Sequence, residues 1–138
     1  MLFGAAAVVA AIDLSQKALA VFERGGAVLA HDRSAPYVAG LAAATLAWAG
    51  AIALVRSDSI ALAGGLVLGG AIGNLASFAL WPSLPGVPDP LVAGGIAFNL
   101  ADVSALLGLV LLVPAIVVFA ARNRERLFEP VRTGVRPR

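Results

Sequence analysis

The residues of this 138-residue chain that could do chemistry are few, and most are carboxylic acids and amides set in apolar sequence. Asp89 lies in a proline-rich segment, and Asp102 follows thirteen residues later in an apolar stretch. Two carboxyl groups that lie close together do not both ionise, so such a pair shares one proton. One acid then acts as general base on a water molecule, and the other, protonated, polarises a carbonyl group. This chemistry would hydrolyse a peptide bond without a metal ion, a serine or a cysteine.

Four more polar residues interrupt apolar stretches elsewhere: Asp13, Lys17, Asn74 and Asn99. Asp13 and Lys17 are four residues apart with the acid first, the favoured order for an ion pair on one helix. Ionisable groups inside a membrane span are unfavourable unless they face the helix bundle or a wet cavity. All four are therefore candidates for supporting roles in a site.

Each candidate also has a purely structural explanation. Asp13 and Lys17 could form a helical ion pair and nothing more, and Asn74 could bridge two helices, which is worth roughly 1 kcal/mol. Asp102 could cap the first turn of a helix, helped by the helix dipole. Asp89 could be an ordinary turn residue between prolines.

Cysteine and histidine chemistry is largely excluded. The chain has no cysteine and one histidine, His31. It therefore has no disulfide, thiolate metal site or cysteine nucleophile, and no zinc site built from two or three histidines. We predict no metal ion and no cofactor, and we expect His31 to be solvated rather than functional.

The composition is that of a membrane protein. Hydrophobic residues make up 60% and charged residues 13% of the chain, and the mean hydropathy is +0.93. A soluble domain is about 45–50% apolar and about 25% charged. We predict an all-α integral membrane protein with one domain (1–121) and a basic cytoplasmic tail (122–138). Its four transmembrane helices are expected over 2–22, 37–55, 60–81 and 96–121.

The positive charges indicate the orientation of these helices. Six of the ten basic residues lie in the tail, and Arg56 lies between the second and third spans. Basic loops face the cytoplasm, so both termini are predicted inside and segments 23–36 and 82–95 outside. The tail is expected to contact membrane lipids rather than nucleic acid. A cleaved signal peptide is not expected, because no basic segment precedes the first apolar stretch, which Asp13 and Lys17 interrupt.

This topology predicts that the polar residues converge. Lys17, Asn74, Asn99 and Asp102 all fall in the outer half of the bilayer at a rise of about 1.5 Å per residue. Asp13 lies deeper and Asp89 lies above the same half. We therefore expect one polar pocket that opens toward the outer leaflet. Small residues at four-residue spacing in the third span are expected to serve close helix packing; they are Gly65, Gly69 and Gly73.

Three motifs, taken together, resemble the signal peptidase II family, the prolipoprotein signal peptidases of bacteria. They are GGAIGNL at residues 69–75, GVPD at 86–89 and FNLAD at 98–102. They are similar to the family's GGAxGNxxDR, VVDF and FNxAD motifs, and Asp13 and Lys17 match its first-span D-x-x-x-K pattern. The resemblance extends over all four spans in order and is strongest over 64–110.

The resemblance implies four helices with both termini inside, and cleavage of signal peptides just before a lipid-modified cysteine. The cleavage would occur at the outer face of the bacterial cytoplasmic membrane. It implies that Asp89 and Asp102 form the catalytic pair and that Asn74 and Asn99 orient them. The partner would be a lipid-modified prolipoprotein; the oligomeric state stays open.

The chain also departs from the family pattern. Ser77 and Phe78 replace the family's Asp-Arg pair, which supports the site, so a looser pocket is expected. The family's VVDF loop reads Val-Pro-Asp-Pro here, and the separation from Asp89 to Asp102 is shorter than the family pattern predicts. The extracytoplasmic segment between the first two spans is also expected to be reduced. These departures favour a divergent member.

Two other functions follow from the same residues. A catalytically impaired relative would bind lipoprotein or lipid without turnover. A small ion-coupled or scaffold membrane protein would use Asp13 and Lys17.

Overall fold

The structure is a computed structural model and describes residues 1–24 and 34–127. Four of its helices are long and apolar enough to cross a membrane, which confirms the prediction of a mostly helical protein with four candidate membrane spans. They are α1 (Leu2–Glu23), α2 (Ala35–Ala53), α3 (Asp58–Leu80) and α4 (Leu100–Arg122). The shorter elements are β1 (Leu91–Ala93), β2 (Ile96–Phe98) and α5 (Arg124–Leu127).

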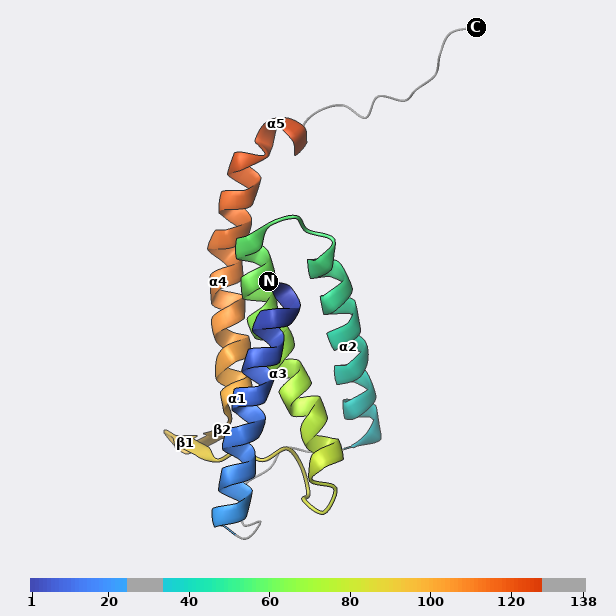
Figure 1. The fold of residues 1–138 in the computed structure, drawn as a ribbon, viewed down its shortest axis with the longest axis vertical. Coiled ribbons are helices and arrows are strands. Elements are labelled where there is room, and N and C mark those ends of the chain that lie inside the picture. The colour runs from blue at the N-terminus through green and yellow to red at the C-terminus, as the bar shows by residue number, and fades with distance from the viewer. Residues whose placement is uncertain (25–33, 128–138) are drawn as a thin grey trace, which may run out of the picture.

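The four long helices alternate in direction (Figure 1). The N-terminus, the turn between α2 and α3, and α5 lie toward one end of the bundle. The connection from α3 to α4, with its small hairpin, lies at the other end, which we call the loop end.

Helix α3 lies at the centre of the bundle, because its glycines let three helices approach it. A Cβ atom at Gly65 or Gly69 would lie 2.7 Å from a backbone oxygen of α1, and one at Gly64 would lie 2.6 Å from the Ile52 side chain of α2. A Cβ atom at Gly70 would collide with the backbone oxygen of Ala101 in α4. The predicted packing role of the small residues is thus confirmed for Gly65 and Gly69.

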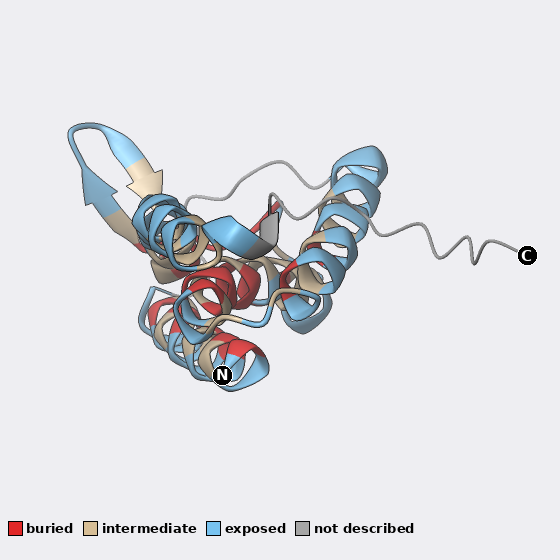
Figure 2. Ribbon diagram, turned by 90° about the horizontal axis from the view of Figure 1, so that it is seen from above, coloured by how far each residue is buried: buried red, intermediate tan, exposed pale blue. Residues whose placement is uncertain are grey.

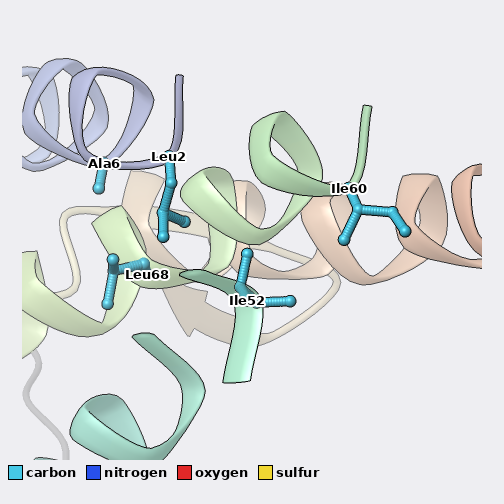
Figure 3. Packing of buried hydrophobic residues seen from close by; sticks show 5 residues of the cluster. All are labelled: Leu2, Ala6, Ile52, Ile60 and Leu68. Atoms are coloured by element: carbon cyan, nitrogen blue, oxygen red, sulfur yellow. The ribbon is translucent and has the colours of Figure 1, made fainter. Parts of the chain in front are cut away.

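The apolar core lies away from the loop end. Leu2, Ala6, Ile52, Ile60 and Leu68 form a buried cluster there (Figure 3). The outward surfaces of the helices are largely exposed, as the view along the bundle shows (Figure 2). Most exposed large side chains of α4 are aliphatic, as expected for contact with lipid.

The start of α4 differs from the prediction. Residues 96–98 form a strand instead of helix, and α4 begins at Leu100. Gly94 and Gly95 have φ angles of 57° and 81°, so they form the two-residue turn of an antiparallel hairpin. The all-α prediction therefore lacked this hairpin. It also treated 124–127 as tail, where the structure has α5.

Two predicted regions lie mainly outside the described residues. The segment predicted between the first two spans includes residues 25–33, with His31. The predicted tail includes residues 128–138.

Candidate functional site

The structure brings all six sequence-predicted site residues together at the loop end. Two come from α1, one from α3, one from the loop after α3, and two from the start of α4. They are Asp13, Lys17, Asn74, Asp89, Asn99 and Asp102. Four of the six are buried, with exposed fractions between 0% and 3%.

Asp13 and Lys17 form a buried ion pair on α1. Their Oδ2 and Nζ atoms are 2.7 Å apart, and neither side chain is exposed. Oδ1 of Asp13 accepts a hydrogen bond of 2.9 Å from the backbone N–H of Ala101, in the first turn of α4. Asp13 therefore ties α1 to the start of α4. It lies so close to Gly73 of α3 that a Cβ atom there would collide with its carboxylate.

Lys17 connects this ion pair to α3. Its Nζ donates to Oδ1 of Asn74 at 2.7 Å and to Oγ of Ser77 at 3.2 Å. An ammonium group has three donors. Asp13, Asn74 and Ser77 provide an acceptor for each of them. Desolvation of a buried charge is costly unless the charge is paired and hydrogen-bonded, and Lys17 meets that condition.

Asn74 connects Lys17 to Asp102. Its Nδ2 donates to Oδ1 of Asp102 at 3.2 Å. The amide orientation is fixed by Lys17, because the ammonium cannot accept a hydrogen bond and must face the amide oxygen. A chain of hydrogen bonds thus runs from the Lys17 ammonium to the Asp102 carboxylate.

Asp102 and Asn99 form a capping box at the N-terminus of α4. The backbone N–H of Asp102 donates to Oδ1 of Asn99 at 3.1 Å. The backbone N–H of Asn99 donates to Oδ2 of Asp102, also at 3.1 Å. The capping role considered for Asp102 is therefore real. The Asp102 carboxylate also accepts a hydrogen bond from Asn74, so capping is not its only contact.

Asn99 binds both candidate acids. Its Nδ2 donates to Oδ1 of Asp89 at 2.7 Å and to the backbone oxygen of Pro88 at 3.4 Å, while its backbone N–H binds Asp102. Asp89 is 3% exposed and sits between two buried prolines, whose fixed φ angles restrict this loop. Asn99 thus holds two carboxyl groups, that of Asp89 in the loop and that of Asp102 in α4.

Sequence reasoning missed the part played by Ser77. This residue is fully buried; its hydroxyl accepts from Lys17 and donates to the backbone oxygen of Gly73 at 2.7 Å. Its position three residues after Asn74, on the same helix face, was the available signal. The neighbouring Phe78 packs edge-on against Tyr37 of α2, with ring centroids 6.2 Å apart.

A largely apolar cavity adjoins this polar network. It lies between α2, α3 and α4 and has a volume of about 270 Å³. Asn74 lines it, so the cavity reaches the residue that binds Asp102. The other lining residues are Leu41, Ala44, Thr45, Trp48, Val67, Gly70, Ala71 and Ala105.

Across residues 1–24 and 34–127, no three histidine, cysteine or acidic side chains gather as a metal ion would require. Comparison of the chain with family models, curated proteins and solved structures gave no match.

Proposed function

We propose that the protein is a signal peptidase II-like aspartic endopeptidase that cleaves signal peptides from lipid-modified prolipoproteins. The observation that carries the proposal is the arrangement around Asn99, which hydrogen-bonds to Asp89 and to Asp102. Two buried or half-buried carboxyl groups held by one residue suit the acid–base pair that metal-free peptide hydrolysis needs.

The surroundings of the pair support this chemistry. The chain Lys17–Asn74–Asp102 orients one carboxylate, and the prolines beside Asp89 orient the other. Catalysis depends on such fixed geometry, because groups that are already in place need little reorganisation in the transition state.

The proposed setting is the cytoplasmic membrane of a bacterium, with both termini inside and the loop end at the outer face. The four apolar helices support membrane insertion, and the arginines of the tail support this orientation. The site would then meet substrates whose signal peptides are still embedded in the membrane.

The cavity between α2, α3 and α4 suits an acyl chain of the substrate, because its lining is mostly apolar and it adjoins Asn74. Replacing Ala44 with phenylalanine should fill part of it. If the phenylalanine ring excludes two methylene groups of the acyl chain, about 0.8 kcal/mol of binding free energy is lost for each of them. We therefore expect KM to rise about tenfold with kcat unchanged. Steady-state cleavage of a lipid-modified reporter measures both constants.

Ala43→Phe is the matched control for Ala44→Phe. Ala43 is adjacent on α2 and exposed, and it does not line the cavity. Equal KM values for Ala44→Phe and the wild type would show that the cavity does not bind the substrate.

The proposal is tested with the purified full chain and a diacylglyceryl-modified prolipoprotein reporter in detergent and lipid. We expect cleavage directly before the modified cysteine, identified by mass spectrometry of the products. The same reporter with serine at that position cannot be lipid-modified and should stay intact.

An authentic signal peptidase II serves as positive control. If it cleaves the reporter while the folded protein does not, the peptidase proposal fails. Binding of the reporter without turnover would then identify a non-catalytic relative.

A further inference from the structure

Two cavities meet at the end of the bundle opposite the loop end, between the start of α3 and the last turns of α4 (Figure 1). We propose that together they bind one anionic phospholipid, with its phosphate in the first cavity and an acyl chain in the second. The inference does not depend on the peptidase proposal, because the two cavities share no residue with the network around Asp102 and the test needs no cleavage.

The first cavity is polar and is lined by two arginines. It has a volume of about 300 Å³. Arg56 comes just before α3 and Arg122 ends α4, so two neighbouring helices of opposite direction bring their cations to one cavity. Among the described residues that line it, Asp58 is the one acid, so positive charge is in excess. Guanidinium groups bind phosphate oxygens through paired hydrogen bonds. The cavity therefore suits a phosphate group.

The second cavity is an apolar groove that continues from the first. It lies between α3 and α4 and has a volume of about 320 Å³. Ser59, Ala115 and Val118 line both cavities, so the two are contiguous. Leu62, Leu111 and Val118 line the groove and are still 42%, 41% and 46% exposed, so the groove is accessible from the surface of the bundle. An acyl chain can enter it from the surrounding lipid.

The two cavities meet where both helices change from charged to apolar sequence. No acidic or basic residue occurs in 59–80 after Asp58, or in 103–121 before Arg122. Such a boundary is expected at the level of the lipid headgroups. The phosphate of a phospholipid lies at this level and its acyl chains lie on the apolar side, which is the order of the two cavities. With the orientation proposed above, the lipid belongs to the cytoplasmic leaflet, where basic pockets between helices bind anionic headgroups.

Native mass spectrometry of the delipidated full chain tests the arginines. The protein in nonionic detergent is mixed with equal amounts of phosphatidylglycerol and phosphatidylcholine that carry the same acyl chains. We expect the adduct with one phosphatidylglycerol to exceed the other about fivefold or more. Arg56→Gln and Arg122→Gln should each lower this preference about fivefold, the effect of one arginine near anionic lipid. Arg124→Gln is the matched control and should keep the preference, because Arg124 is exposed at the same end and lines neither cavity.

A second pair of variants tests the groove. Val118→Trp places a larger side chain where the two cavities meet. We expect the affinity for phosphatidylglycerol to fall about tenfold, the effect of excluding roughly two methylene groups. Val117→Trp is the matched control, because Val117 is the next residue on α4, is 61% exposed and lines neither cavity. It should bind the lipid like the wild type.

Equal adducts of the two lipids in the wild type would overturn the proposal. So would an equal loss of preference in Arg124→Gln and Arg56→Gln, because it would indicate a general attraction to the basic end of the bundle. Glycerophosphoglycerol has the same headgroup without acyl chains and should not displace the lipid at equal concentration. If it does, or if both tryptophan variants weaken binding equally, the groove holds no acyl chain and the site is not one for a phospholipid. The wild-type comparison decides the proposal even if a variant does not fold.

Discussion

Replacing Lys17 with methionine is expected to lower the free energy of unfolding by about 3–5 kcal/mol. The substitution leaves the Asp13 carboxylate fully buried without its ion-pair partner, and it removes donors from Asn74 and Ser77. Breaking a buried pair by removing one partner has effects of this size, because the remaining charge is desolvated and uncompensated. Unfolding in mixed detergent micelles measures the change.

The double variant Asp13→Leu/Lys17→Met is the control for charge. It removes both partners, so it should be clearly less destabilised than Lys17→Met, although it also loses the bond from Asp13 to Ala101. If the single variant is as stable as the wild type, the pair is not buried as described. If the double variant is the less stable of the two, lost packing rather than an unpaired charge explains the effect.

The helices were predictable because each apolar stretch is long enough to span a bilayer and ends in polar or proline-rich sequence. Helix α3 was predicted at 60–81 and found at Asp58–Leu80. Its first residues differ because Ser57 caps the helix, with its hydroxyl accepting from the backbone N–H of Ile60.

The beginning of α4 was not predicted because apolar character continues across it. Residues 91–98 are all apolar or glycine, so hydropathy does not separate the hairpin from the helix. Two local signals were available. Gly94-Gly95 between apolar residues is typical of a tight hairpin turn. Asn99 with an acid three residues later is typical of a capping box.

The convergence of polar residues was predictable from helix direction and depth, but the connections between them were not. The spacing of Asp13 and Lys17 indicated their pairing. Nothing in the spacing indicated that Asn99 would bind Asp89 across the hairpin, because this contact depends on how the proline-rich loop folds back.

The resemblance to signal peptidase II led us to expect a looser pocket, because Ser77 and Phe78 stand where that family has an Asp-Arg pair. The structure shows how the two positions are used here. Ser77 is an acceptor for Lys17, and Phe78 packs on Tyr37 of the neighbouring helix. The Ser77 hydroxyl and the Asp13 carboxylate thus both accept from Lys17, and Asp13 balances its charge.

The second large effect is expected at the acid pair. Asp102→Asn and Asp89→Asn each replace one carboxyl group of the proposed acid–base pair by an amide that can neither take nor give the proton. Each should lower the rate of reporter cleavage by roughly 10³-fold or more. The double variant should be little worse than either single one, because residues that act as a unit have strongly non-additive effects.

The most direct test of the account is therefore cleavage of the diacylglyceryl-modified reporter by four proteins side by side: the wild type, Asp89→Asn, Asp102→Asn and Asp58→Asn. Asp58 is an exposed acid at the opposite end of α3 and controls for loss of a carboxylate as such. The account predicts cleavage by the wild type and Asp58→Asn, and loss of cleavage in the other two while both remain folded. Cleavage that persists in Asp89→Asn or in Asp102→Asn would contradict it.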